Sequence, residues 1–294
     1  MSLAEVSVLT PSYNYGRFVE DAILSVARQT RVSLQHVIQD GGSADETHEV
    51  LSHHSERLDW RSEPDQGQSD ALNKALSRAT GRWIAWLNAD EFYLPGSLAY
   101  LVRVGERTGA DVVYGECMFV DEVGRMLRLR SQYRFSYEVL RRYWGCISSC
   151  GVLFRRSVLG EDPWDPGIRR VMDWDLFMRL HSRGARFLNV RYPVGAFRVH
   201  SDQVTAIPWQ AWREEDQLLS ARYGLSTGLT EGWKSYKKGR LLHRAHKLVE
   251  GSYLRELKAR PLRGKDIRWF RSSTAHANMG ELARRCYGGL AIDG

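Results

Sequence analysis

The sequence has few of the features that mark secreted, membrane-spanning or repetitive proteins. Four cysteines in 294 residues are too few for a disulfide scaffold, and Cys146 and Cys150 lack a second ligand pair at zinc spacing. No apolar run approaches the roughly 18 residues of a membrane-spanning helix. The first residues have neither a basic segment nor a long apolar one, so we expect no secretion signal. We therefore expect reduced thiols and a cytoplasmic protein.

Two nucleotide-binding signatures are also missing. The first apolar run is not followed by G-x-G-x-x-G, the pattern of dinucleotide dehydrogenases, and the run Asp40-Gly41-Gly42-Ser43 does not supply it. The glycine-rich, lysine-containing N-terminal loop of nucleotidyltransferases is absent as well. Both absences argue against these two classes of enzyme.

The composition is that of a globular protein, with 43% hydrophobic and 26% charged residues. The net charge of +7 is concentrated near the C-terminus, where residues 231–294 carry 15 Lys and Arg against 6 Asp and Glu. A basic segment of this kind is able to meet nucleic acid, an anionic membrane or an acidic partner. Because no nucleic-acid reader motif accompanies it, we expect no nucleic-acid partner.

The most informative stretch is 82–91, an apolar run that ends in Asn88, Asp90 and Glu91. A short continuous apolar run is typical of a buried parallel strand, and ligands bind beyond the carboxyl ends of such strands. Closely spaced carboxylates repel one another unless a cation neutralises them, and oxygen donors suit Mg²⁺ or Mn²⁺. The alternative is an acidic turn before a helix that begins near Pro95.

The first half of the chain alternates apolar runs with helical patterns. We predict strands at 6–9, 36–39, 58–62 and 83–87, with helices after the first three, and hence a parallel sheet with right-handed crossovers. Asp40 follows the second strand, where it could also be only a turn former. Ser43 with Glu46 has capping-box spacing, and Ser69 is predicted to cap the third helix, which Gly81 ends.

The second half carries a second acidic cluster. Strands are predicted at 111–115, 118–120, 151–154 and 187–190, with a hairpin near 121–124 and a helix at 135–144. Asp173 and Asp175 begin a helix whose apolar face includes Leu176 and Leu180, and carboxylates there also serve as simple caps. His200 is predicted on an exposed polar loop, where it is surface, a metal ligand or a phosphate partner.

Beyond residue 210 the pattern is helical and basic. An apolar stripe is expected there, made of Leu241, Leu242, Ala245, Leu248 and Val249. Packing on the main domain is the favoured interpretation. The alternative is contact with an anionic membrane surface.

In this order the motifs resemble the family 2 glycosyltransferases of the GT-A fold. They are Val8–Asn14, Ile38–Thr47, Ser62–Gly67, Leu72–Lys74, Ala79–Gly81, Trp86–Glu91 and Met172–Asp175, and the likeness covers roughly residues 5 to 205. The resemblance implies a Rossmann-like, mostly parallel α/β sheet flanked by helices. It implies a domain of residues 1–210, with a nucleotide-binding half at about 1–95 and an acceptor half at about 96–210. A basic helical extension, 211–294, would follow.

The resemblance also implies an activity, metal-dependent sugar transfer of the hexosyltransferase type with inversion. The donor would be a nucleotide-sugar and the acceptor a saccharide or lipid-linked hydroxyl in bacterial cell-surface polysaccharide synthesis. Asp173 would be the general base, with Trp174 and Asp175 on the acceptor side, and Asp90 with His200 would hold Mn²⁺ or Mg²⁺. The residues implied to bind the donor nucleotide are Pro11, Tyr13, Asp40, Asp65, Gln68, Asn88 and Asp90.

The chain departs from the family pattern in two places. Asn88 stands where a carboxylate is usual, although its carbonyl oxygen can still coordinate. Met172 replaces a frequent Glu, which leaves both Asp173 and Asp175 as candidates for the base; motif alignment favours Asp173. The alternatives to an active transferase are a catalytically weak or dead nucleotide-sugar-binding protein of the same fold and a related nucleotidyltransferase. The cytoplasmic location would include peripheral contact with the inner face of the plasma membrane.

Overall fold

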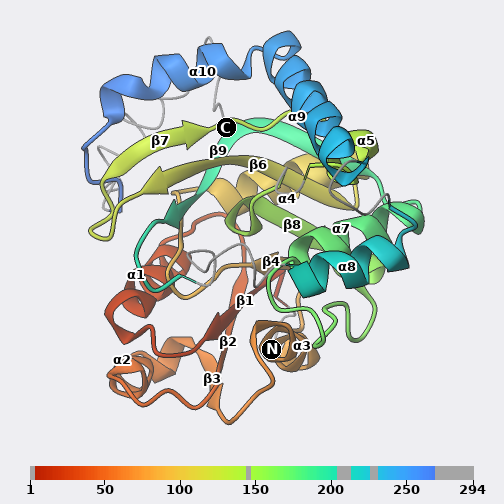
Figure 1. Cartoon of the computed structure of the whole chain (residues 1–294). Helices are drawn as coiled ribbons and strands as arrows, with labels where there is room; N and C mark the ends of the chain where they lie inside the picture. The colour runs from red at the N-terminus through yellow and green to blue at the C-terminus, as the bar shows by residue number, and fades with distance from the viewer. Residues whose placement is uncertain (1–3, 144–146, 204–212, 226–230, 269–294) are drawn as a thin grey trace.

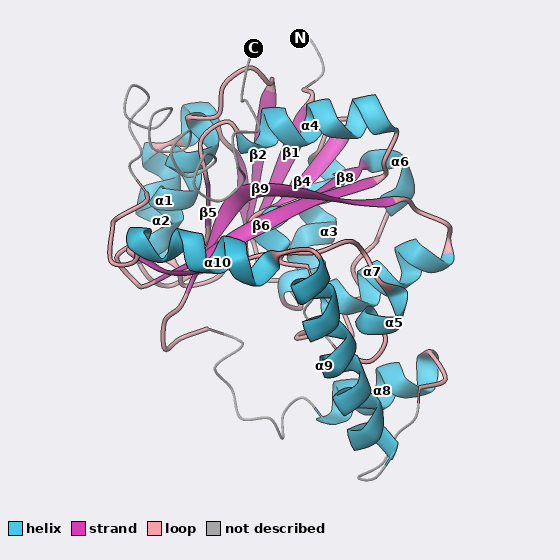
Figure 2. Cartoon of the chain, turned by 90° about the horizontal axis from the view of Figure 1, so that it is seen from above, coloured by secondary structure: helices cyan, strands magenta, loops and turns pink. Residues whose placement is uncertain are grey.

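The computed structural model describes residues 4–143, 147–203, 213–225 and 231–268, in which a nine-stranded sheet is flanked by helices on both faces (Figures 1 and 2). The strands are β1 (Val6–Ser12), β2 (Leu34–Asp40), β3 (Asp59–Ser62), β4 (Trp83–Trp86), β5 (Phe92–Tyr93), β6 (Val112–Val120), β7 (Met126–Arg130), β8 (Val152–Arg155) and β9 (Phe187–Arg198). The α-helices are α1 (Gly16–Ala27), α2 (Thr47–His53), α3 (Gln68–Arg78), α4 (Ser97–Thr108), α5 (Tyr137–Leu140), α6 (Arg156–Leu159), α7 (Met172–Ser182), α8 (Arg213–Arg222), α9 (Glu231–Val249) and α10 (Ser252–Ala259). Three short 3₁₀ turns accompany them, η1 (Ser55–Arg57), η2 (Ser149–Gly151) and η5 (Arg260–Leu262).

The N-terminal half of the sheet has the order β3-β2-β1-β4, and all of these strands are parallel. The predicted parallel sheet is therefore confirmed. Ser12 at the end of β1 pairs with Asp40 at the end of β2, so the polar residues that follow these strands lie at one edge. That edge is where a ligand binds in open parallel sheets.

The parallel strands read as continuous apolar runs because both of their faces are buried. In β4, Trp83 and Ala85 belong to one hydrophobic cluster, with α4, whereas Ile84 and Trp86 belong to the other, with α3 and α7. Successive side chains of a strand point to opposite faces. The two clusters therefore fix β4 on both sides and set the position of the polar residues after it.

The C-terminal half of the sheet is mixed. β8 is antiparallel to β4, and β6 is antiparallel to β8. β9 is parallel to β6, and β5 pairs with β9 in the antiparallel direction. The prediction of separate strands at 111–115 and 118–120 was wrong, because β6 runs through Gly115. A side chain at Gly115 would lie 2.5 Å from the carbonyl oxygen of Tyr192 in β9, so glycine here serves close strand approach rather than a turn. The hairpin to β7 follows as expected.

Several predicted helix ends were wrong, and in two cases the predicted capping side chain has another partner. Ser43 does not cap α2; its hydroxyl donates to Asp40, and α2 starts at Thr47, whose backbone N–H donates to Asp45. Ser69 lies inside α3 and donates to the backbone oxygen of Ile168. The helix predicted at 135–144 is limited to α5, and Trp144 lies outside the described residues.

α9 packs beside α5, and α10 packs beside β7 (Figure 1). The guanidinium of Arg255 in α10 reaches the fully buried carboxylate of Glu116 in β6, with Nε 2.6 Å from Oε1. Among the described residues no helix is both long and apolar enough to cross a bilayer. Cys117 and Cys150 are free thiols, as expected, and Cys146, Cys286 and residues 269–294 lie outside the described part.

Candidate active site

Asp40 ends β2 and organises the loop that follows it. Its fully buried carboxylate accepts hydrogen bonds from the backbone N–H groups of Gly42 and Ser43 and from the hydroxyls of Ser43 and Ser62. Short polar side chains commonly hold the backbone two or three residues onward. Asp40 thus fixes the edge of the predicted nucleotide pocket, and its contact with a base stays a prediction.

The end of β1 supplies an exposed aromatic ring beside this loop. Tyr13 is 61% exposed, whereas Pro11 is buried within β1. Asn14 lies in the left-handed region with φ 55°; its side-chain oxygen accepts from the N–H of Ala44, and its own backbone N–H donates to the Ser43 hydroxyl oxygen. The β1 and β2 loops are therefore tied together, and the Tyr13 ring is left free to meet a planar ligand.

Asp65 lies against the same loop. A methyl group at Gly41 would come 2.8 Å from Asp65 Oδ2, so the glycine permits the close approach. Asp65 also accepts from the N–H of Gly67, and burial raises its pKa. The structure thus brings Asp65 to Asp40, as predicted.

Asn88, the position at which a carboxylate is missing, is committed to protein partners. Its side-chain oxygen accepts from Gln68 Nε2 at 2.6 Å and from the indole N–H of Trp86 at 2.7 Å. Gln68 begins α3, so this bond joins α3 to the end of β4. An oxygen with two short protein donors is poorly suited to coordinate a cation. Asn88 therefore shapes the loop, and cation binding by its neighbour Asp90 stays a prediction.

Asp90 and His200 meet although 110 residues separate them. His200 Nε2 is 3.0 Å from Asp90 Oδ2, and the imidazole side chain has no exposed area. The prediction that His200 lies on an exposed loop was wrong, because the loop folds back and places the ring between Tyr15 and Phe18. The backbone N–H of Asp202 approaches Nδ1 at 3.3 Å. This contact favours the tautomer that carries its proton on Nε2, toward Asp90.

Arg198, two residues before His200, connects the end of β9 to Asp90. The residue is fully buried, and its Nε donates to the backbone oxygen of Asp90 at 2.9 Å. Nη2 forms an ion pair with Asp21 at 2.6 Å, and the guanidinium lies over the ring of Phe18. β9 is thereby fastened to the loop after β4. Sequence analysis missed Arg198, although a single Arg at the end of an apolar strand was a usable signal.

Glu91 is the second carboxyl of the loop and is almost fully buried. It accepts from the backbone N–H of Asn88 at 3.1 Å and from the hydroxyl of Ser149 at 3.4 Å. Burial, and then the charge of Asp90, raise the pKa of Glu91 well above its usual range. The raised pKa of Glu91 disfavours a second negative charge beside Asp90.

Asp173 lies at the start of α7, as predicted. Its Oδ1 accepts from the backbone N–H of Trp174 at 2.7 Å. Burial raises the pKa of Asp173 to about 6, opposed in part by hydrogen bonds and the charge of Arg130. No ion pair to Asp173 is present within the described ranges. A carboxylate with a pKa slightly below neutral is well matched to accept a proton at cellular pH.

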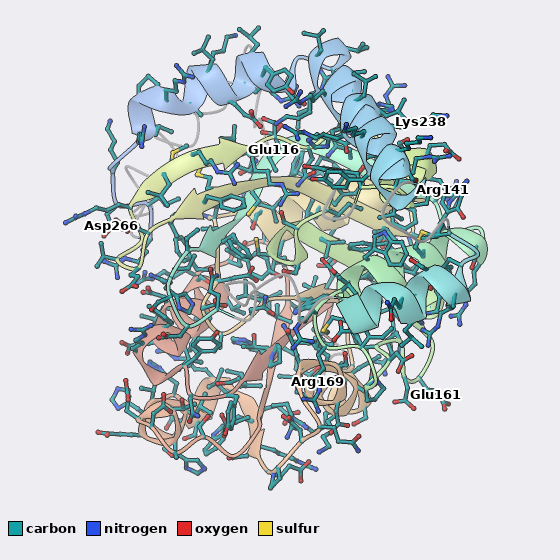
Figure 3. The ribbon with its side chains drawn as sticks, viewed as in Figure 1. Glu116, Arg141, Glu161, Arg169, Lys238 and Asp266 are labelled. Carbon is teal, nitrogen blue, oxygen red and sulfur yellow. The ribbon has the colours of Figure 1, made fainter. Side chains whose placement is uncertain are left out.

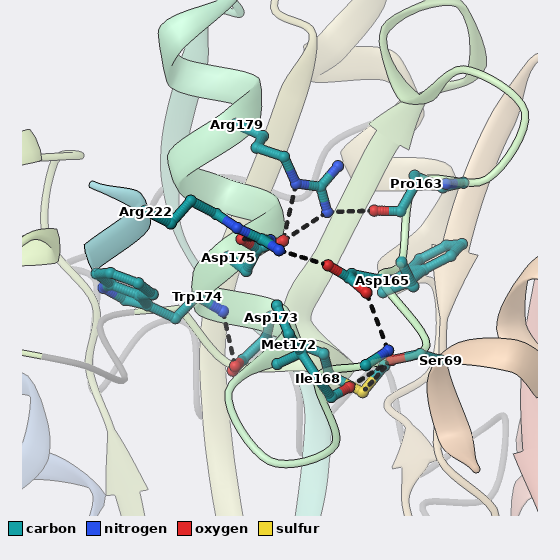
Figure 4. A network of polar contacts seen from close by, with 12 residues as sticks. Ser69, Pro163, Asp165, Ile168, Met172, Asp173, Trp174, Asp175, Arg179 and Arg222 are labelled. Carbon is teal, nitrogen blue, oxygen red and sulfur yellow. Dashed lines mark hydrogen bonds and ion pairs between the residues drawn. The ribbon is translucent and has the colours of Figure 1, made fainter. Parts of the chain in front are cut away.

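Asp175, the other candidate base, is enclosed by cations (Figure 4). Its carboxylate has no exposed area and receives Arg179 at 2.8 Å, Arg222 at 3.0 Å and the Tyr223 hydroxyl at 2.7 Å. Trp174 is also buried, and its indole donates to the backbone oxygen of Leu140. The structure therefore gives Trp174 and Asp175 packing roles, contrary to the expectation that they face the acceptor.

A chain of contacts joins the segments that carry Asp173 and Asp90. Gln68 at the start of α3 bonds to Asn88, and the next residue, Ser69, donates to Ile168 and contacts Met172 Sδ at 3.4 Å. Met172 is the residue before Asp173. The two acidic clusters, far apart in sequence, thus both adjoin the N-terminus of α3. A separate cavity of about 650 Å³ lies among α3, α7 and α8, lined in part by Asp70, Arg179 and Arg222; no predicted site residue lines it.

Solved structures with this fold include sugar-transferring enzymes of the GT-A class. The structure is similar to residues 1–349 of S. aureus TarS in complex with UDP, with a TM-score of 0.60 and 16% identity over 87% of this chain and 77% of that one. It is also similar to a mannosyltransferase from Pyrobaculum calidifontis in complex with GDP-Man and Mn²⁺, with a TM-score of 0.56 and 19% identity over 82% and 70% of the two chains. At these identities the likeness establishes the fold.

The chain belongs to glycosyl transferase family 2, whose family model matches residues 7–162. A PGL/p-HBAD biosynthesis glycosyltransferase of Mycobacterium tuberculosis is 30% identical over 200 residues, which cover 65% of this chain and 76% of the relative. A putative teichuronic acid biosynthesis glycosyltransferase of Bacillus subtilis is 26% identical over 70% of this chain and 83% of its own length. The predicted family and fold are confirmed, and the protein is a glycosyltransferase.

Proposed function

We propose that this glycosyltransferase moves a sugar from a nucleotide-sugar to a hydroxyl of a saccharide or lipid-linked acceptor, with inversion at the anomeric carbon. The names of the two relatives, which concern a PGL/p-HBAD product and teichuronic acid, support a role in bacterial cell-surface glycan synthesis. A cytoplasmic reaction, at the inner face of the plasma membrane, is part of the proposal.

The proposed donor site is the edge formed by the ends of β1, β2 and β4. Tyr13 offers an exposed ring on which a base is able to stack, and Asp40 and Asp65 shape the pocket beside it. Gln68 and Asn88 close the side toward α3. The complexes of related folds with UDP and GDP-Man support a nucleotide at such an edge.

Asp90 and His200 fit a divalent cation chemically. Asp90 presents a carboxylate oxygen, and His200 Nε2, 3.0 Å from it, would coordinate only in the tautomer that carries its proton on Nδ1; a carboxylate with an imidazole suits Mn²⁺ better than Mg²⁺. Within the described residues no group of three ligating side chains gathers, so the donor diphosphate would complete the coordination. A bound cation would neutralise the charge that develops on the departing diphosphate.

Asp173 is the proposed general base. As the acceptor oxygen bonds to the anomeric carbon, the bond from that carbon to the diphosphate breaks and its electron pair leaves with the diphosphate. The proton of the acceptor hydroxyl passes to the Asp173 carboxylate, and its removal makes this weak nucleophile reactive enough to attack. The observation that carries this proposal is an aspartate without an ion-pair partner in the described chain, with a pKa of about 6, on a segment that adjoins the start of α3, as the Asp90 loop does.

The direct test compares donor binding with turnover. Thermal shifts with nucleoside diphosphates and their sugars, with and without Mn²⁺, identify the donor, because a ligand that binds the native state stabilises it. Hydrolysis or transfer of that donor then measures turnover. Asp173→Asn is expected to bind the donor and to lose transfer; full transfer by this variant would remove Asp173 from the mechanism.

Two alternatives give different outcomes. A catalytically weak or dead nucleotide-sugar-binding protein, an idea that the Asn88 substitution favours, would show the thermal shift without donor hydrolysis. A nucleotidyltransferase would release pyrophosphate from a nucleoside triphosphate and a sugar phosphate. Neither result is expected if Asp173 serves as the base.

A further inference from the structure

The most exposed aliphatic side chains of the described residues gather on two neighbouring helices. They are Val249 at 85% exposed, Leu248 at 72%, Leu241 at 67%, Leu254 at 55% and Leu257 at 51%. The first three belong to α9 and the last two to α10, and the two helices follow each other along one side of the molecule (Figures 1 and 2). We call these five side chains the α9–α10 apolar face.

The apolar face is turned outward because α9 is attached through its polar side. His243 Nδ1 lies 2.8 Å from the Tyr133 hydroxyl, and His246 stacks on the same ring. Gly239 leaves no room for a side chain, since a methyl group there would lie 2.6 Å from Arg142. The expectation that the stripe packs on the main domain was wrong for Leu241, Leu248 and Val249, whereas Leu242 does pack against the core.

α10 is attached in the same way. Arg255 reaches Glu116 and the backbone oxygen of Gln132, and Ser252 donates to the same oxygen. Ala259 is fully buried. With this polar side fixed inward, Leu254 and Leu257 are left on the surface.

On both helices the described acidic side chains face the body of the protein, and the unpaired basic side chains face solvent. The acidic residues turn inward: Glu250 accepts from the backbone N–H of Arg134, and Glu256 pairs with Lys247 at 2.5 Å. The exposed cations of these helices that form no ion pair with another described residue are Lys234, Lys238, Arg240, Arg244 and Lys258. Lys238 points away from the body of the protein (Figure 3).

We propose that the α9–α10 apolar face binds the surface of an anionic lipid bilayer. Exposed leucines and valine would enter the interface between headgroups and acyl chains, and the surrounding cations would meet lipid phosphates. The charges oppose the main alternative, a second copy of the chain, since pairing through the same face would bring like charges together.

The location of this face deepens the proposed function, and the relation to the acceptor described next rests on that function. α9 and α10 cover α5 and β7, and β7 ends at Arg130, whose charge acts on Asp173. The lipid surface would therefore lie on the acceptor side of the molecule. A lipid-linked acceptor could then reach Asp173 with its lipid still in the membrane.

Sedimentation of the full chain with vesicles tests the proposal. We expect strong binding to vesicles that contain phosphatidylglycerol, weak binding to phosphatidylcholine alone, and weaker binding at high salt. Leu248→Gln should lower the partition coefficient about tenfold, because a leucine leaves the interface. The pair Lys238→Gln and Arg244→Gln should lower it about fivefold per charge. Leu218→Gln is the matched control, since Leu218 in α8 is 47% exposed and outside the face.

The variants concern exposed side chains, so folding is expected to be preserved and is checked by thermal melting. Absence of vesicle binding by a folded wild-type chain would overturn the proposal, and so would equal losses in Leu218→Gln and Leu248→Gln. A dimer that forms without lipid and dissociates in Leu248→Gln would assign the face to a second copy instead. Asp173→Asn should bind vesicles normally, so a failure of the proposed activity remains distinguishable from a failure of membrane binding.

Discussion

The loop after β4 and the first turn of α7 both carry clustered carboxylates, and the protein treats them differently. In the β4 loop the charge on Asp90 faces His200, and burial raises the pKa of the neighbouring Glu91. In α7 the inner carboxylate, Asp175, is matched by two arginines, whereas Asp173 has no such partner among the described residues. Under the proposed function, the first region would hold a cation, and the second would leave one carboxylate to take a proton.

The largest effect should come from Asp173→Asn. Loss of a general base is expected to slow transfer by about a thousandfold. Because burial raises the pKa of Asp173 from 3.8 to about 6, the ionised carboxylate destabilises the folded state at neutral pH, and the variant should be more stable there by up to about 3 kcal/mol. Kinetics and melting curves measure both effects. A residue that only caps α7 would instead leave transfer intact.

Asp175→Asn is the contrasting variant. It removes the charge that Arg179 and Arg222 share, and we expect a loss of about 2–3 kcal/mol in the free energy of unfolding, reduced by the partial exposure of the arginines. Transfer per folded molecule should change little. Urea unfolding and kinetics at saturating donor distinguish this result from the previous one; a stable, inactive Asp175→Asn would make Asp175 the base.

His200→Ala should weaken the response to Mn²⁺. With the imidazole gone from Asp90, the Mn²⁺ concentration that half-saturates the thermal shift with a nucleoside diphosphate should rise at least about tenfold. His53→Ala is the control, because His53 is exposed at the end of α2. An identical Mn²⁺ response in the two variants would exclude His200 from the cation site.

The smallest expected effect is the pH dependence of the wild-type protein. Asp173 accepts a proton only when ionised, so transfer should fall as the pH drops through about 6, approaching tenfold per pH unit below that value. The profile of kcat is to be measured where melting shows a folded protein. A flat profile across this range would contradict the assignment of Asp173.

The sequence predicts local structure well where a pattern has one physical meaning. The continuous apolar run of β4 predicts a strand buried on both faces, and the two hydrophobic clusters confirm it. The position of Asp40 at the end of β2 and of Asp173 at the start of α7 also followed from such patterns. In these cases the residues that set the structure are neighbours in the chain.

The errors arise where the decisive partner is distant in sequence. Ser69 looks like a helix cap until Ile168 provides another acceptor, and His200 looks like a surface residue until its loop folds against Asp90. The stripe of α9 faces solvent because Tyr133 and Arg142 bind the opposite side of the helix. A single sequence contains no local signal for these contacts.

The ion pair between Arg255 and Glu116 bears on where the protein can be shortened. A fragment that stops at the end of the family-like region, near residue 210, would lack the guanidinium that α10 inserts beside the central strand β6. The carboxylate of Glu116 would remain inside the sheet at a substantial cost in solvation. Expression of a minimal catalytic unit should therefore keep α10, or replace Glu116 by a neutral residue of similar size.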